Sequence, residues 1–330
     1  MHQNFPTSRD PHSERSDPID TRPLRAIFGV VALATILTAT TGCDKHAETA
    51  EVVHRTSLAN RPNVVFLLFG DQNDPRLMPV VTTIEGLVAP VSLNAQGWRD
   101  FDHIYFRPGT SVSVYRDGRL DGEGKIRRGM WDAAGPLYTL PGCHAVKPLA
   151  ALVPRLAAGG EVMLERIATS ERLAPAPDRG PVPPSALDTA RALALKVSQH
   201  EGITRNARAG LDLAVFAIHT GATRAPTLIA SYMERGGGIQ GRPRHLFMLA
   251  DSTASTYAST FVHTAGDSIP EFRRYIDHAD ITGDGVDELL LEGWKNGGDS
   301  FLLFLRFTNG AWREMARGES TWCADPKLKR

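Results

Sequence analysis

Short runs of aliphatic, β-branched and aromatic residues, each ended by a turn signal, recur along most of this 330-residue chain. In its second half they occupy residues 211–220, 227–233, 245–249, 257–264, 288–293, 301–308 and 312–315. Runs of this length favour strands over helices, and Gly-rich joints between them favour an antiparallel meander. The sequence therefore predicts a mainly β fold, although no repeat of fixed period runs through the whole chain.

The first half of the chain shows the same alternation around one clear turn. Ser111–Tyr115 alternates with period two, Asp117-Gly118 follows, and Leu120–Ile126 provides a returning run. An Asp-Gly pair between alternating runs is a strong hairpin signal, because both residues tolerate a positive φ angle. We expect a β-rich domain over residues 62–170.

A proline-rich stretch separates the two halves. Leu173–Pro184 holds five prolines, which is typical of a stiff, extended linker. Ser185 and Asp188 then have the spacing of a capping box at the start of a helix, whose apolar stripe is Leu187, Ala190, Ala194 and Val197. The predicted architecture is two β-rich domains of antiparallel meanders and hairpins, joined by a linker over 171–184 and one helix. The second domain, residues 185–330, holds the helix and a meander.

The N-terminal region has the features of an export signal. Arg22 and Arg25 precede the uncharged residues 26–42, and Cys43 follows them. A charged start, a short apolar stretch and small residues at its end describe a segment that directs secretion. An uncleaved anchor helix and an ordinary secretory signal share this pattern, and each of them also places residues 44–330 outside the cytoplasm.

The Thr-Thr-Gly-Cys end of this segment resembles the lipobox of bacterial lipoproteins. The resemblance implies a signal peptide over residues 1–43 that ends at Cys43, a lipid on that cysteine, and a polar tether over 44–61. It also implies that the protein is exported and lipid-anchored to the bacterial cell membrane or outer membrane, facing the periplasm or the exterior. Several acyl chains on one residue would anchor it stably.

Two further cysteines, Cys143 and Cys323, remain once Cys43 carries a lipid. Exported proteins occupy compartments in which disulfides persist, so these two most simply pair with each other. The alternative is a nucleophilic thiol at Cys143 beside His144, but neighbouring residues point in different directions. We therefore predict a Cys143–Cys323 disulfide.

The segment 280–288 concentrates oxygen ligands within one short loop. The candidate ligands are the side chains of Asp280, Thr282, Asp284 and Glu288 and the backbone carbonyl of Val286. Calcium prefers six to eight oxygen ligands, and closely spaced oxygens on a tight turn supply several of them. The sequence predicts a structural Ca²⁺ site here, and the alternative is a hairpin whose Asp and Gly residues only satisfy turn geometry.

This loop, followed directly by a hydrophobic strand, resembles the calcium loop of FG-GAP or VCBS-type β-propeller repeats. In those extracytoplasmic repeats the ion binds within a blade, and the proteins often serve in recognition or adhesion. The resemblance implies the same ligand roles for the five residues above, with the ion stabilising the fold.

The composition and the absence of known catalytic motifs argue against several classes of function. The 37 basic and 37 acidic residues give a formal net charge of zero, which argues against a nucleic-acid partner. No catalytic residue is predicted, because no HExxH, phosphate loop or GxSxG occurs. The sequence favours a non-catalytic binding or structural module of the cell envelope, held to the membrane by lipid and partnered by an envelope protein or glycan. The alternatives are an extracytoplasmic hydrolase with scattered site residues, which a His beside a carboxylate in a deep cleft would favour, and an assembly factor.

Overall fold

Strands dominate the structure, a computed structural model, as the sequence predicts. It describes residues 61–70, 75–129, 131–132, 135–136, 150–156, 164–234, 245–253, 256–265, 271–295 and 300–318. Within these residues all strand pairs are antiparallel, which confirms the mainly β fold class. Cys43, Cys143 and Cys323 lie outside the described residues, so the lipid attachment and the disulfide stay predictions.

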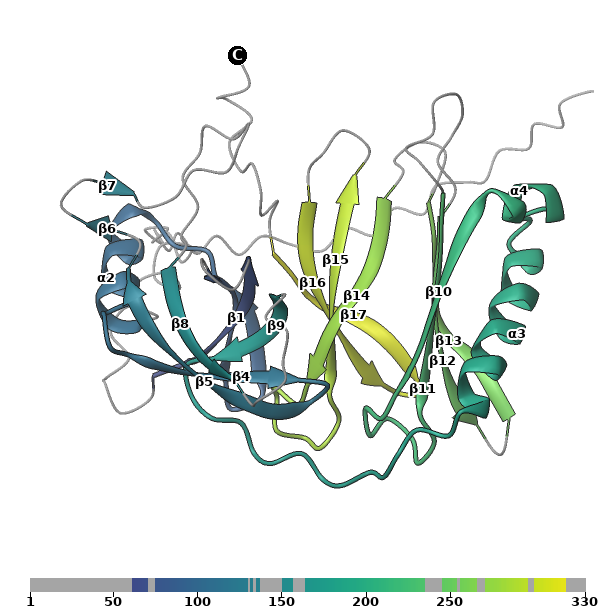
Figure 1. Cartoon of the computed structure of the whole chain (residues 1–330), viewed down its shortest axis with the longest axis horizontal. Helices are drawn as coiled ribbons and strands as arrows, with labels where there is room; N and C mark the ends of the chain where they lie inside the picture. Colours follow the sequence, from purple (N-terminus) through teal and green to yellow (C-terminus); the bar gives the residue numbers. More distant parts are fainter. Residues whose placement is uncertain are drawn as a thin grey trace, which may run out of the picture. The chain divides into compact units, whose positions relative to one another are not determined.

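The first sheet uses seven strands from the first half of the chain (Figure 1). They are β1 (Asn63–Gly70), β2 (Arg76–Ile84), β3 (Leu87–Pro90), β4 (Ser111–Arg116), β5 (Arg119–Arg128), β8 (Ala150–Leu156) and β9 (Leu164–Thr169). Their order is β1-β9-β4-β5-β8-β2-β3, and β1 also pairs with β2, so six strands form a closed ring. Closure gives every strand of the ring two neighbours, while β3 extends from β2 as an edge strand. Two short strands, β6 (Trp131–Asp132) and β7 (Gly135–Pro136), pair separately.

The second and third sheets are four-stranded meanders in chain order. The second sheet contains β10 (Leu211–Ile218), β11 (Thr227–Glu234), β12 (His245–Thr253) and β13 (Thr256–Thr264). The third sheet contains β14 (Glu271–Ala279), β15 (Glu288–Lys295), β16 (Ser300–Thr308) and β17 (Ala311–Arg317). Neighbouring strands are joined by short connections, so each register is fixed locally.

The third sheet is buried on both faces. Leu289 and Leu291 of β15 pack in a cluster with Phe247 of the second sheet. Leu290, between them in the chain, packs in another cluster with Val65 of the first sheet. Alternate residues of a strand point to opposite faces, so this continuous apolar run contacts a sheet on each side. The two β-rich regions therefore share a hydrophobic core.

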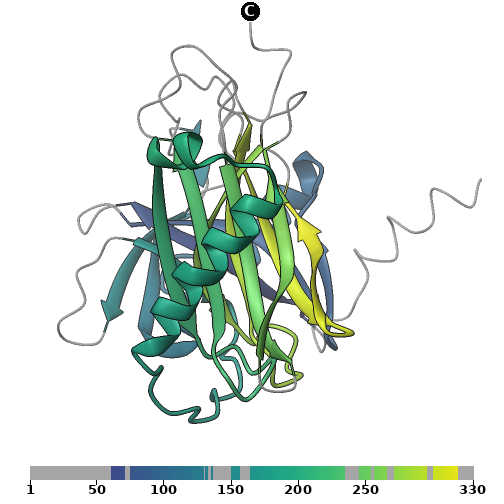
Figure 2. The ribbon, with the colours of Figure 1, turned by 90° about the vertical axis from the view of Figure 1, so that its right-hand side faces the viewer.

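Helices cover the other faces of the first and second sheets. The unpredicted helix α2 (Ala95–Tyr105) begins after Asn94, whose side chain accepts a hydrogen bond from the Gly97 amide, and it packs Phe101 under the first sheet. Helix α3 (Ser185–His200) lies across the second sheet (Figure 2) and buries Ala190 and other small residues against it. A short helix, α4 (Arg205–Ala209), follows. None of the described helices combines the length and apolar character needed to cross a membrane.

The predicted cap at Ser185 is wrong, although the predicted helix is present. Pro184 is the residue that precedes the first turn, its backbone is already helical, and no side chain caps the helix. The fixed φ angle of proline suits the start of a helix, which explains why the turn begins one residue earlier than the capping-box pattern indicates.

Candidate functional site

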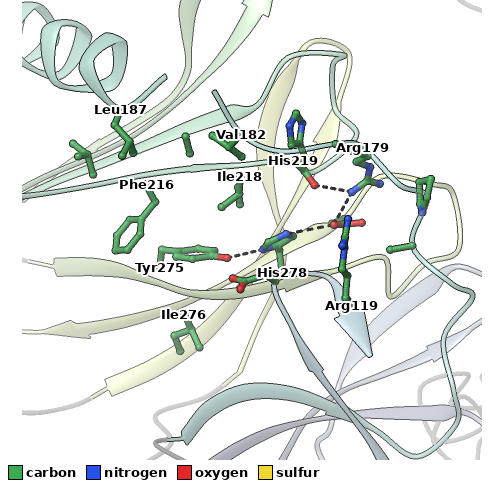
Figure 3. A pocket seen from close by; sticks show the side chains of 17 residues that line it. Arg119, Arg179, Val182, Leu187, Phe216, Ile218, His219, Tyr275, Ile276 and His278 are labelled. Atoms are coloured by element: carbon green, nitrogen blue, oxygen red, sulfur yellow. Dashed lines mark hydrogen bonds and ion pairs between the residues drawn. The ribbon is translucent and has the colours of Figure 1, made fainter. Parts of the chain in front are cut away.

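A cavity of about 670 Å³ opens between the proline-rich segment, the tip of the β4–β5 hairpin, β10 and β14 (Figure 3). We call one side its apolar wall, which consists of Val182, Leu187, Val215, Phe216 and Ile218. We call the other side its polar end, which consists of Arg179, Tyr275, His278 and Asp287. The cavity thus offers an amphipathic lining to whatever enters it.

The side chains of the polar end form a connected row. The Tyr275 hydroxyl and His278 Nδ1 are hydrogen-bonded at 2.6 Å, and His278 Nε2 lies 3.6 Å from Asp287 Oδ2 (Figure 3). Arg179 Nη1 donates to the same Asp287 oxygen at 2.8 Å. The His278–Asp287 separation is too long for a hydrogen bond, so these two groups face each other without sharing a proton.

Arg179 ties the proline-rich segment to the loops of two sheets. Its Nη1 also donates to the His219 carbonyl at 2.7 Å, and its Nη2 donates to the Gly285 carbonyl at 2.8 Å. The Asp287 amide in turn donates to the Thr220 carbonyl at 2.7 Å. The stretch predicted as a linker therefore contributes a central residue of the site.

A β-bulge explains how Tyr275 and His278 share one side of β14. Residues three apart on a regular strand point to opposite faces. The register of the β14–β15 pair shifts between Tyr275 and Asp277, and such a shift changes the face that the following residues present. The bulge therefore brings the phenol and the imidazole into contact.

The tip of the β4–β5 hairpin is fixed against this row. Asp277 Oδ1 accepts from the Asp117 amide at 3.0 Å and from the His278 amide at 2.8 Å. Gly118 packs so closely that an added Cβ would lie 2.7 Å from Asp287 Oδ2 and 3.3 Å from His278 Nε2. The Asp117-Gly118 turn is present as predicted, and it also closes the polar end of the cavity.

Burial displaces the pKa values of the polar end. It lowers the pKa of His278 to about 3, helped by the Arg179 charge, so the imidazole is neutral at physiological pH. Burial raises the pKa of Asp287 to about 6 against the opposing hydrogen bond from Arg179, and raises the pKa of Asp277 to about 7. It also raises the pKa of Tyr275 well above its ordinary value, so the phenol keeps its proton. Displaced pKa values that cluster in a cavity are typical of functional sites.

Two buried polar atoms beside the cavity lack partners. His219 Nε2 and Asp287 Oδ1 have no hydrogen-bond partner among the described residues. Nearby, Asp117, Asp277 and His278 each offer one ligand atom, and these atoms lie within 4.8 Å of one another. In the part of the chain that the structure describes, this is the one group of three or more His, Cys, Asp or Glu side chains with that geometry.

The predicted calcium ligands lie in the loop between β14 and β15 and at the first residue of β15, a segment that we call the carboxylate loop (residues 280–288). Asp280 Oδ1 accepts from the amides of Gly283 at 2.6 Å and Asp284 at 3.1 Å, and its Oδ2 accepts from the Gly285 amide at 2.9 Å. Asp284 Oδ1 accepts from the Val286 amide at 2.9 Å. Much of the oxygen capacity of the loop therefore binds its own backbone.

Arg306 of β16 contacts the carboxylates of Asp284 and Glu288, while Asp287 of the same loop binds Arg179. Arg306 Nη2 lies 2.6 Å from Asp284 Oδ2, and its Nε lies 3.6 Å from Glu288 Oε1. Glu288 Oε1 also accepts from the Thr282 hydroxyl at 2.9 Å. The structure thus brings Thr282, Asp284 and Glu288 together around a guanidinium group, while Asp280 caps the backbone.

Sequence reasoning missed the residues that make the polar end. Asp287 is not among the five predicted calcium ligands, although it precedes Glu288 directly, and Arg179 lies in a stretch that predicts a linker. The local signal that was available is the His278 and Tyr275 pair directly before the carboxylate loop. No family model, curated protein or solved structure matches this chain.

Proposed function

We propose that the protein is an exported, lipid-anchored binding module of the cell envelope that takes a small amphipathic molecule into the cavity. The observation that carries this proposal is the lining of the cavity, in which an apolar wall faces a polar end. Its volume of about 670 Å³ falls within the range of small-molecule sites. The apolar wall would bind a hydrocarbon or ring body, and the polar end would bind the head group.

The exposure of Phe216 supports a binding role for the apolar wall. Phe216 is 42% exposed and lies beside Tyr275, with the ring centroids 5.6 Å apart. A large apolar side chain at the mouth of a cavity gains free energy when a ligand covers it, because apolar surface then leaves water. The cellular location in this proposal rests on the lipobox-like segment at Cys43 and on the Cys143–Cys323 pair. The proposed partners are the membrane and an envelope protein or glycan.

A hydrolase is the second candidate, because His278 lies near a carboxylate in a cavity. Two observations favour binding over hydrolysis. The 3.6 Å between His278 and Asp287 leaves the imidazole without a carboxylate hydrogen bond to orient it. Among the described residues that line the cavity, none is Ser, Thr or Cys, and the one hydroxyl belongs to Tyr275.

We also propose that the carboxylate loop binds Ca²⁺ as a structural ion. Its oxygens suit calcium chemically, because Asp280, Asp284 and Glu288 supply carboxylates and Thr282 a hydroxyl. Arg306 now contacts two of those carboxylates. Calcium binding would therefore replace contacts of Arg306, and the ion would neutralise the loop and hold its turn.

The binding proposal is tested with anilinonaphthalene sulfonate (ANS), a fluorescent probe with apolar rings and an anionic group. We expect saturable binding to the 330-residue chain, weakened about tenfold or more by Phe216→Ser because a buried aromatic contact is lost. Leu195→Ser is the matched control, since Leu195 is 43% exposed and does not line the cavity. Equal weakening by both substitutions, or by neither, contradicts the proposal. Turnover of chromogenic esters that His278→Gln abolishes would instead favour the hydrolase.

The calcium proposal is tested by thermal unfolding of the EDTA-treated chain. We expect saturating Ca²⁺ to raise the melting temperature by about 5 °C or more, because an ion that binds only the folded state stabilises it. Asp284→Asn should remove this response, and Asp178→Asn, on the exposed proline-rich segment, should leave it intact. A melting temperature that does not respond to Ca²⁺ means that the loop is a turn held by its own hydrogen bonds and by arginine side chains, without an ion.

A further inference from the structure

We propose that the end of the β2–β3 hairpin, residues 84–87, contacts the surface of a zwitterionic lipid bilayer. We call these four residues the membrane tip. The proposal rests on the lipid anchor of the proposed function, because that anchor brings the chain to a membrane. It goes beyond that function in assigning the part of the folded chain that faces the bilayer and the class of lipid that suits it.

The membrane tip exposes a pair of aliphatic side chains. Leu87 is 77% exposed, more than any other large apolar side chain among the described residues, and Ile84 is 40% exposed. The register of β2 and β3 places Ile84 directly opposite Leu87, so the two side chains lie side by side on one face of the hairpin. Apolar surface in water is costly, and contact with lipid hydrocarbon would remove that cost.

A tight and supported turn presents this pair. Glu85 and Gly86 have φ angles of +50° and +77°, as a two-residue hairpin turn with two positive φ angles requires. A Cβ at Gly86 would lie 3.4 Å from the Thr282 carbonyl, so the turn packs closely against the carboxylate loop. Val88, the next residue, packs against the core cluster between the first and third sheets. The aliphatic pair is therefore held outward by a short turn with a fixed base.

The chain enters the fold at the same end of the first sheet. Asn63, the first residue of β1, lies opposite Thr83, which directly precedes the membrane tip. The 18 residues 44–61 link Cys43 to this end. A chain of that length reaches at most about 60 Å when extended, and a flexible one spans roughly 20–25 Å on average. A lipid on Cys43 would therefore keep the membrane tip close to the bilayer.

The charges beside the membrane tip favour zwitterionic lipids over anionic ones. A hollow of about 530 Å³ adjoins the tip, and its charged lining residues are one base and three acids, Arg61, Glu85, Glu171 and Asp280. The negative potential of an anionic bilayer would repel this surplus of acids. A zwitterionic head group offers a phosphate to the arginine and an ammonium group to the carboxylates.

The form of β3 argues against a second copy of the chain as the occupant. This edge strand has four residues and ends at Pro90, which has no amide hydrogen to donate to a further strand. Short edge strands that contain proline resist pairing with other chains. Two aliphatic side chains are also far smaller than the roughly 800 Å² that each partner buries in a stable protein interface. A fluid lipid layer needs neither strand pairing nor a matching surface.

The test measures binding of the 330-residue chain to phosphatidylcholine vesicles by flotation in EDTA. We expect Leu87→Ser to weaken binding about fivefold or more, because a large apolar contact with lipid is lost. Ile84→Ser should weaken it less, since Ile84 is the less exposed of the pair. Leu195→Ser, at a 43% exposed position of α3, is the matched control and should leave binding unchanged. The apolar residues 26–42 are the same in all variants, so their own affinity for lipid cancels in these comparisons.

Four outcomes overturn the inference: no binding to the vesicles, equal binding by the native chain and Leu87→Ser, equal weakening by Leu195→Ser, or tighter binding to phosphatidylglycerol vesicles. A dimer that forms without lipid and that Leu87→Ser dissociates would assign the aliphatic pair to a second copy instead. The ANS titration is made without vesicles and depends on Phe216, which lines the cavity. Failure of the membrane tip with intact ANS binding, and the reverse, are therefore distinguishable.

Discussion

The second and third sheets are both four-stranded antiparallel meanders, but the polar side chains in the loop after the first strand differ between them. In the second sheet the loop residue Thr220 and Thr227, the first residue of β11, are linked through their hydroxyls at 2.8 Å. Thr227 then donates to Asp251 of β12 at 2.7 Å. These contacts are short, buried and made mostly by neutral groups.

The third sheet has a similar arrangement with charged residues, although Thr282 lies one position further along its loop than Thr220. The loop residue Thr282 donates to Glu288, the first residue of β15, at 2.9 Å. Leu289 pairs with Leu305 and Leu228 pairs with Ala250, so Glu288 and Arg306 directly adjoin the third sheet's last paired residues as Thr227 and Asp251 do in the second. Arg306 Nε lies 3.6 Å from the Glu288 carboxylate. One backbone arrangement thus holds a hydroxyl pair in one sheet and an ion pair in the other.

This difference distinguishes a loop that joins two sheets from a loop that suits cation binding. Asp251 also accepts from Trp312 of the third sheet at 2.8 Å, so the second sheet uses its acid to join two sheets. In the third sheet the pKa of Glu288 is raised to about 8 by burial and by the charges of Asp284 and Asp280. The fold therefore only partly balances the acidic groups of the carboxylate loop, so Glu288 holds a proton at neutral pH, and a bound cation would favour its ionised form.

The largest effect expected is from Asp251→Ala. The substitution leaves the buried Thr227 hydroxyl and Trp312 indole, and the half-buried Thr260 hydroxyl, without their shared acceptor. We expect it to cost about 4 kcal/mol in the free energy of unfolding, measured in urea. Arg306→Ala, at the equivalent position, should cost only about 1 kcal/mol, because Glu288 can take up a proton. Equal costs at both positions would mean that the two loops are equally structural.

The sequence predicts the strands and the tight turns because their signals are local. Ser111–Arg116 and Arg119–Arg128 pair through the Asp117-Gly118 turn that the Asp-Gly pattern indicates. The apolar stripe of α3 is also evident, and Ala190 and Ala194 are fully buried. Period and turn chemistry depend on residues within a few positions of each other, so one sequence suffices to find them.

The remaining features depend on contacts that are distant in the chain. Closure of the first sheet needs β1 to pair with β9, which begins about a hundred residues later. The polar end needs Arg179 to meet Asp287, a separation of 108 residues. The bulge that aligns Tyr275 with His278 leaves no mark in the hydrophobic pattern. The similarity of the second and third sheets cannot be seen in the sequence either, because Thr227 and Asp251 correspond to residues as different as Glu288 and Arg306.

A smaller effect, dependent on pH, is expected for Glu288→Gln in calcium-free buffer. The pKa of Glu288 rises on folding to about 8, so its stabilising contribution is complete below the unfolded value and is lost as pH rises through 8. Gln cannot ionise, so the variant should be more stable than the native chain by on the order of 2–3 kcal/mol at about pH 9, and not at about pH 5.

Urea unfolding across this pH range measures the effect of Glu288→Gln. The groups that face Glu288 are Asp280, Asp284 and Thr282 of the loop and Arg306 of β16. Thr227→Val is the matched control, since it removes the equivalent side-chain contact in the second sheet without removing an ionisable group. Its cost should not vary with pH, and parallel pH profiles for the two variants would contradict the assignment to Glu288.

The smallest expected effects come from two glycines, one in each of these loops, that both have positive φ angles, Gly221 at +84° and Gly283 at +78°. A Cβ at Gly221 would lie 2.6 Å from Arg179 Nη2 and from the Gly285 carbonyl, whereas a Cβ at Gly283 meets nothing within 4 Å. Gly283→Ala should therefore cost only the backbone strain of about 1 kcal/mol, and Gly221→Ala about 2 kcal/mol because Arg179 must also move. Urea unfolding measures both costs. Similar costs would mean that the carboxylate loop is packed as tightly at Gly283 as the loop of the second sheet is at Gly221. The carboxylate loop would then lack the free space around Gly283 that would let it rearrange around a cation.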